Sequence, residues 1–164
     1  YRAPGNWNFA EEMLENQIGG DKLGMNDARW GQFEDWACYL GFAWNNKLSN
    51  SGPLTPDPTR YIKKCLPDIF RKNGTQTLLV KQFFEELAKI CPVIEGGFLR
   101  QEIHEKIGLK STDTLSTVTS FMLIRLEKAG LIKMLDKSDA DAYLLNGVKR
   151  RRCSEIEWLG EGID

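Results

Sequence analysis

The feature that most constrains this chain is an internal repeat at an offset of 89 residues. Residues 8–19 align without a gap on residues 97–108, and the same offset carries residues 33–42 onto residues 122–131. The matched pairs are Phe9 with Phe98, Leu14 with Ile103, Ile18 with Ile107, Gly19 with Gly108, Phe33 with Met122, Ala37 with Leu126, Gly41 with Gly130 and Phe42 with Leu131. Apolar residues build cores and glycines end helices, so the repeat predicts two copies of one folding unit.

The second copy contains a complete set of elements. Apolar residues recur every three or four positions from Thr77 to Cys91, which predicts an amphipathic helix. Ser111-Thr112-Asp113 offers capping side chains for a longer helix, which Gly130 ends. The elements predicted, in order, are helices over 77–91, 100–107 and 114–129, strands over 131–135 and 142–145 that form a hairpin, and a third strand after Val148.

The segment 126–132 marks the point where the longer helix is expected to turn through Gly130 into the first strand. Its pattern, L-x-x-A-G-L-I, resembles the winged-helix superfamily of helix-turn-helix proteins. The resemblance covers residues 79–146 well and the first copy more loosely. It implies a mainly α fold with small β-hairpins (α+β), built as two tandem winged-helix units. Because this fold binds DNA, RNA or protein, the resemblance alone selects no ligand.

The first copy keeps the second half of the same pattern. A helix over 26–40 is expected to end at Gly41, and residues 42–44 can begin a wing strand that returns at 53–55. The opening helix of this copy is expected upstream of residue 1. The predicted division is 1–56 for the first winged-helix unit, 57–74 for a connecting helix that Pro67 should kink or split, and 75–164 for the second unit with a C-terminal extension.

Composition limits the class of protein. Hydrophobic residues make up 41% and charged residues 27%, as in ordinary globular domains, and no apolar run approaches the roughly 20 residues that span a bilayer. The scattered cysteines predict free thiols and a reducing compartment, most simply the cytoplasm. The net charge of −1 provides no general attraction to nucleic acid, so a DNA site would have to be local.

Residue types for familiar catalysis are scarce. His104 is the only histidine, no two cysteines are paired in sequence, and neither a P-loop nor a dinucleotide-binding glycine pattern is present. His104 lies between Glu102 and Glu105 and is best explained as an ordinary, partly exposed helical residue. We therefore expect no catalytic residue, no metal site and no cofactor, and a binding module in place of an enzyme.

Hydroxyl side chains gather at the start of the longer helix of the second copy. The candidate DNA contacts there are Thr112, Thr114, Ser116, Thr117 and Ser120. Hydroxyls and free backbone N–H groups at a helix N-terminus suit phosphate contacts and an approach to the major groove. Helix capping and a solvated polar face explain the same residues equally well. Asp113 and the wing-tip residues Asp139 and Asp141 carry the wrong charge for DNA.

A run of four basic residues follows the turn at Asn146-Gly147. Its members, Lys149, Arg150, Arg151 and Arg152, complete the set of candidate DNA-binding residues. On a strand beside the wing, alternate side chains would point to opposite sides, and the run would then put two charges on each face. A phosphate-binding stripe is one interpretation, and a charged edge strand that discourages aggregation is an equal alternative.

The first copy is rich in aromatic residues. Its expected helix and first wing strand carry Trp30, Phe33, Trp36, Tyr39, Phe42 and Trp44. These exceed what one narrow core stripe requires. Burial against the connecting helix is the main explanation, and a surface for a protein partner or for self-association is the alternative.

Two functional hypotheses follow. The first is a DNA-binding module whose second unit contacts duplex DNA through its third helix and a basic strand. The layout resembles tandem winged-helix proteins encoded with bacterial DNA-modification and phage-defence systems, which implies a part in antiviral defence. The alternative is a protein–protein interaction scaffold subunit of a larger complex, similar to the acidic tandem winged-helix subunits of chromosome-organising ATPases.

Overall fold

The computed structural model describes residues 11–12, 16, 26–45, 54–108, 113–147 and 151–160. Within these residues the chain is mixed α and β, with five helices and small antiparallel sheets, in agreement with the predicted mixture of helices and hairpins. The chain divides into two compact units, Tyr1–Tyr61 and Ile62–Asp164. None of the helices in the described ranges is long and apolar enough to cross a membrane.

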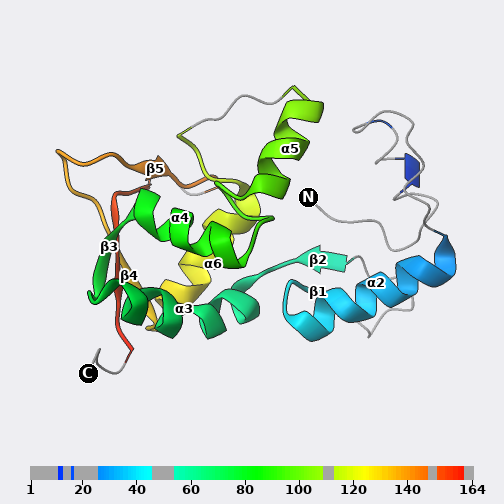
Figure 1. The fold of residues 1–164 in the computed structure, drawn as a ribbon, viewed down its shortest axis with the longest axis horizontal. Helices are drawn as coiled ribbons and strands as arrows, with labels where there is room; N and C mark the ends of the chain where they lie inside the picture. The colour runs from blue at the N-terminus through cyan, green and yellow to red at the C-terminus, as the bar shows by residue number, and fades with distance from the viewer. Residues whose placement is uncertain are drawn as a thin grey trace. The chain divides into compact units, whose positions relative to one another are not determined.

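The described part of the first unit is a helix followed by a β-hairpin (Figure 1). Its elements are α2 (Asp27–Leu40), β1 (Ala43–Asn45) and β2 (Leu54–Pro56), and the two strands pair antiparallel. The backbone N–H of Arg29 donates to the side chain of Asn26 at 3.0 Å, which satisfies a free donor at the helix start. These bounds confirm the predicted helix and hairpin. The repeat segment 8–19 lies almost wholly outside the described residues.

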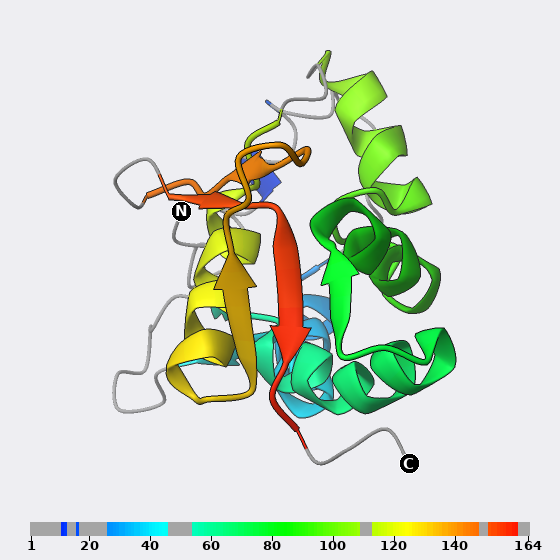
Figure 2. The same ribbon diagram turned by 90° about the vertical axis from the view of Figure 1, so that its left-hand side faces the viewer.

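The second unit holds a three-stranded sheet, a two-stranded sheet and most of the helices. Its elements are α3 (Thr59–Asn73, which begins in the first unit), β3 (Thr77–Leu79), α4 (Val80–Ile90), α5 (Phe98–Lys106), α6 (Thr117–Lys128), β4 (Ile132–Leu135), β5 (Tyr143–Leu144), β6 (Arg152–Cys153) and β7 (Glu155–Trp158). The larger sheet has the order β3-β7-β4 with antiparallel pairing throughout, as Figure 2 shows. β5 and β6 form the smaller one.

The core of the second unit lies where α3, α4 and α6 pack on the larger sheet. Phe70 is fully buried, with its ring stacked on Trp158 at 5.8 Å and 6.1 Å from the ring of Phe83. The other fully buried large side chains are Ile62, Leu66, Ile69, Leu78, Leu87, Leu115, Met122, Leu123, Leu126 and Ile132. Each helix contributes side chains spaced three or four residues apart, which is the spacing of one helical face.

The connecting helix is a single element. α3 begins after Asp57, whose carboxylate accepts a hydrogen bond from the backbone N–H of Thr59 at 3.1 Å. Pro67 lies inside the helix and does not split it, although the sequence predicted a kink or a break there. The proline is half-buried, between the buried Leu66 and the exposed Asp68.

Strand pairing in the second unit differs from the prediction. Residues 77–79, expected to open a helix, form β3, because Leu78 points into the core and the strand pairs with β7. The expected hairpin of 131–135 with 142–145 is also wrong, since β4 pairs with β7 while β5 pairs with β6. Periodicity cannot predict that residues 77–79 form a strand, because their partner strand β7 lies more than 70 residues away in sequence. Nor can periodicity predict whether β4 pairs with β5 or with β7.

The repeat extends to individual hydrogen bonds. At the end of α2, the N–H of Gly41 donates to Cys38 O at 3.2 Å and the N–H of Phe42 donates to Ala37 O at 2.9 Å. At the end of α6, each bond recurs between residues 89 positions later: Gly130 N–H to Glu127 O at 2.9 Å, and Leu131 N–H to Leu126 O at 3.0 Å. Gly41 and Gly130 both have left-handed backbone, with φ of 88° and 68°. Both units therefore turn from helix to strand by the same motif.

Replacing these two glycines with alanine gives a matched test of that motif. Gly130→Ala should cost about 1–2 kcal/mol, because its only penalty is a side chain in left-handed backbone and nothing lies within 4 Å of the added Cβ. Gly41→Ala should cost more, because its Cβ would also lie 3.1 Å from Arg60 Cβ and from the backbone N of Tyr61. Urea denaturation measures both costs, and equal costs would contradict the close approach at Gly41.

Candidate nucleic-acid interface

One face of α6 is turned toward solvent. The exposed side chains on it are Thr117, Phe121, Arg125 and Lys128, which recur at intervals of three or four residues. The exposed fraction of Phe121 is 55%. The opposite face is buried through Met122, Leu123 and Leu126. Since the helical repeat separates these two sets, α6 presents a stripe of one hydroxyl, one aromatic ring and two cations.

Two hydroxyls of α6 are buried with hydrogen-bond partners. Thr119 is 1% exposed and donates through Oγ1 to the carboxylate of Glu95. Ser120 is 0% exposed, and its Oγ accepts the backbone N–H of Asn146 at 2.8 Å. Because buried polar groups need partners, these bonds fix the rotation of α6 about its own axis.

The chain that carries the basic run is attached to one flank of α6. Asn146 is bonded to Ser120, and Arg151 forms an ion pair with Glu127 at 2.7 Å. Ser120 and Glu127 are seven residues apart and lie on the same side of the helix. The two attachments therefore bring the chain before and after residues 148–150 alongside α6, next to its exposed stripe.

The described part of the basic run is paired with carboxylates. Arg151 is half-buried on Glu127, and Arg152 lies 3.8 Å from Asp136 with both side chains half-exposed. Lys149 and Arg150 lie outside the described residues. A strand is present after Val148, as predicted, although it is divided into β6 and β7.

The structure separates the predicted hydroxyl contacts. Thr117 lies on the exposed stripe, and Thr114 is exposed and bridged through its backbone to Leu144. Ser116 caps α6, since its Oγ accepts the N–H of Thr119 at 3.3 Å. Ser120 is buried and has no surface to offer a phosphate, so its role here is to hold the chain at Asn146. Thr112 lies outside the described residues.

Sequence reasoning missed Phe121, Arg125 and Lys128 as candidate contacts. The apolar spacing in the sequence predicts an inner face made of Leu115, Val118, Met122, Leu126 and Ala129, but Val118 is half-buried and Ala129 is exposed. The real buried stripe is rotated toward Thr119, Ser120 and Leu123. The sequence signal for an exposed apolar residue on this helix is the run of four large apolar residues at 121–124, because one helical face cannot bury all four. In the structure only Met122 and Leu123 of this run are buried.

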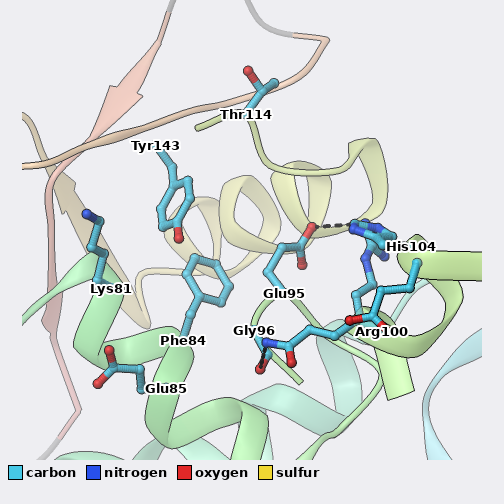
Figure 3. A pocket seen from close by; sticks show the side chains of 11 residues that line it. Lys81, Phe84, Glu85, Glu95, Gly96, Arg100, His104, Thr114 and Tyr143 are labelled. Atoms are coloured by element: carbon cyan, nitrogen blue, oxygen red, sulfur yellow. Dashed lines mark hydrogen bonds and ion pairs between the residues drawn. The ribbon is translucent and has the colours of Figure 1, made fainter. Parts of the chain in front are cut away.

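Beside the start of α6 the surface is hollowed, and Figure 3 shows this hollow from close by. Its volume is about 580 Å³. The lining residues come from α4, the 91–97 connection, α5, Thr114 and Tyr143. At its base, the ring of Phe84 meets Tyr143 edge to face at 5.8 Å.

The carboxylate of Glu95 ties this region together. It accepts the backbone N–H of Ser116 at 2.9 Å and the hydroxyl of Thr119, and its side chain is 14% exposed. The guanidinium of Arg100 on α5 lies 3.5 Å away. Burial alone would raise the pKa of Glu95, but the hydrogen bonds from Thr119 and Ser116 and the charge of Arg100 outweigh it and lower the pKa. The ionised carboxylate therefore holds the N-terminus of α6 to the connection and to α5.

Titratable groups around the hollow do not resemble a metal centre. His104 lines the hollow and is half-buried. Within the described ranges, no three or more His, Cys, Asp or Glu side chains are grouped to hold a metal ion. All four cysteines are free, and burial raises the pKa of Cys91 to about 11 and that of Cys153 to about 12. Such thiols stay protonated near neutral pH.

The aromatic residues of the first unit divide into two sets. Trp30 is buried, and Phe42 stacks on Tyr61 of α3 at 4.4 Å between ring centres. The exposed set consists of Phe33, Trp36, Tyr39 and Trp44, with exposed fractions from 45% to 71%. Burial against the connecting helix, the main explanation from sequence, therefore holds for Phe42 and does not account for the exposed set.

Comparison with known proteins decides the family. A family model described as DpdG-like matches residues 1–140. The chain belongs to the DpdG-like family. Neither the curated proteins nor the solved structures contain a significant match. Membership of the DpdG-like family indicates a role in a DNA-modification or defence system, in agreement with the resemblance noted from sequence.

Replacing Glu95 with glutamine tests its structural role. A group with a lowered folded-state pKa stabilises the fold above its unfolded pKa, near 4.5, and this stability is lost as the pH falls through the folded pKa. Glu95→Gln should therefore lower the free energy of unfolding by about 1–3 kcal/mol at neutral pH and by less below pH 4.5.

Glu85→Gln is the control, since Glu85 is exposed on the same hollow and should leave the unfolding profile unchanged. Denaturation at several pH values provides the measurement. A Glu95→Gln deficit that does not shrink in acid would contradict the role of the ionised carboxylate.

Proposed function

We propose that the chain is a tandem winged-helix DNA-binding module, and not an enzyme, whose second unit binds duplex DNA through the exposed face of α6. The observation that carries this proposal is the pair of exposed cations on that face, Arg125 and Lys128, with Thr117 at the start of the helix. Duplex DNA is a dense row of phosphates, and exposed Arg and Lys side chains supply most of the affinity for it. The link of the family to DNA modification or defence agrees with this ligand.

Element order supports a winged helix in the second unit. In chain order the elements are α3, β3, α4, α6, β4 and β7, and in the sheet β7 lies between β3 and β4. A winged helix is expected to have this chain order and this strand order. α5 is then an insertion between the second and third helices, and α6 takes the place of the recognition helix that enters the major groove. The shared hydrogen bonds at Gly41 and Gly130 support a second, diverged copy in the first unit.

The charge around α6 also supports the proposal. Lys133 is exposed on β4, directly after the helix. The ion pair with Glu127 also holds Arg151, a described residue of the basic run, against the same helix. At the acidic wing tip, Asp141 is paired with Lys81 at 2.6 Å, which offsets part of its repulsion for phosphates. A local cationic surface is thus available in a chain whose net charge is −1.

Fluorescence anisotropy with the purified chain and a mixed-sequence duplex tests this function. Wild type should bind at low salt and weaken steeply as salt rises. Arg125→Gln with Lys128→Gln should reduce the slope of log affinity against log salt by about one per residue. The matched control is Lys64→Gln with Arg71→Gln, which removes the same two charges from exposed positions on α3 and should leave the slope unchanged. Equal slopes for the two double variants would overturn the assignment to α6.

A protein-interaction scaffold is the second candidate, and the exposed aromatic side chains of the first unit favour it. Trp36 is 61% exposed and Tyr39 is 71% exposed, with their rings in edge contact at 5.9 Å. Tryptophan and tyrosine are among the residues most enriched at energetically important interface positions. Failure of the wild-type chain to bind any duplex at low salt would leave this candidate as the better account.

A further inference from the structure

The exposed stripe of α6 has an aromatic ring among its polar residues. Phe121 lies one turn after Thr117 and one turn before Arg125, and 55% of its surface is exposed. Its neighbours Met122 and Leu123 are fully buried and fill the core at that level of the helix. More than half of the Phe121 side chain is therefore left accessible to a ligand in the described part of the second unit.

Base edges in the major groove differ in the chemistry that they offer an apolar side chain. Donors and acceptors on guanine, cytosine and adenine require polar partners, whereas the C5-methyl group of thymine is apolar and takes contacts from residues such as phenylalanine. The flanking Arg125 and Lys128 can contact phosphates, which orient the helix without reading sequence.

We propose that Phe121 is a specificity-determining residue that contacts the C5-methyl group of thymine in the major groove. This inference rests on the proposed binding of duplex DNA by α6. Phe121 lies on the same face of α6 as Arg125 and Lys128, which the helix would bring to the DNA phosphates. It is the one large apolar side chain on the exposed stripe. Affinity in this arrangement comes from Arg125 and Lys128, and discrimination comes from Phe121.

Duplexes that differ only in this methyl group provide the experiment. One duplex has alternating A·T pairs, and the other has deoxyuridine at every thymidine position, so each binding register presents the same chemistry. Wild type should bind the thymine duplex about fourfold more tightly for each methyl group contacted, which is the value of one buried methyl. Phe121→Ala should bind both duplexes equally.

Two control variants are needed. One distinguishes the preference for thymine from overall affinity for DNA, and the other tests whether loss of any exposed aromatic ring has the same effect. Arg125→Gln should weaken binding to both duplexes by the same factor and keep the preference for thymine. Phe98→Ala removes a ring that is 66% exposed on α5 and should leave both affinities and the preference unchanged.

Three results would overturn the inference. Equal affinity of wild type for the two duplexes would reject the methyl contact while leaving duplex binding intact. A thymine preference that survives in Phe121→Ala would assign the reading to another group. Absence of binding to either duplex and to mixed-sequence DNA would reject the proposed function and the inference together, so the two failures are distinguishable.

Discussion

The rotation of α6 about its own axis is the constraint on which the second unit depends. Met122, Leu123 and Leu126 are buried against the core, and the hydroxyls of Thr119 and Ser120 are buried with partners of their own. A buried hydroxyl left without a partner would cost about 1–3 kcal/mol, so turning the helix would break these bonds as well as the apolar packing. The same contacts that stabilise the fold thus determine which side chains face outward.

The two units share a local framework and present different chemistry on it. At the 89-residue offset, the exposed Trp36, Tyr39 and Trp44 of the first unit correspond to the exposed Arg125, Lys128 and Lys133 of the second. The framework itself, a helix that ends at a left-handed glycine and continues into a strand, is the same in both. Such a substitution of aromatic residues for cations is consistent with one unit for phosphates and the other for an apolar surface.

Local signals were sufficient for much of the fold. Gly41 and Gly130 ended their helices where the sequence predicted, and Asn26 capped α2, because these features depend on residues within one turn. Non-local contacts account for the errors. β3 is a strand because it pairs with β7, and Ser120 is buried with the backbone N–H of Asn146 as its hydrogen-bond partner. The central role of Glu95 likewise requires Thr119, which is 24 residues away. In the candidate interface, Thr117 was anticipated, whereas Phe121 and Lys128 emerge once the buried face is known.

Hydrogen–deuterium exchange of the full chain with and without a saturating duplex tests the central claim most directly, because it locates the contact without any substitution. The account predicts slower exchange in peptides covering 113–128 and 143–153, which contain α6 and the chain attached to its flank. Peptides covering α2 and β1 should exchange at the same rate in both states. Protection confined to residues 27–45, with none in α6, would contradict the account and would move the DNA-binding surface to the first unit.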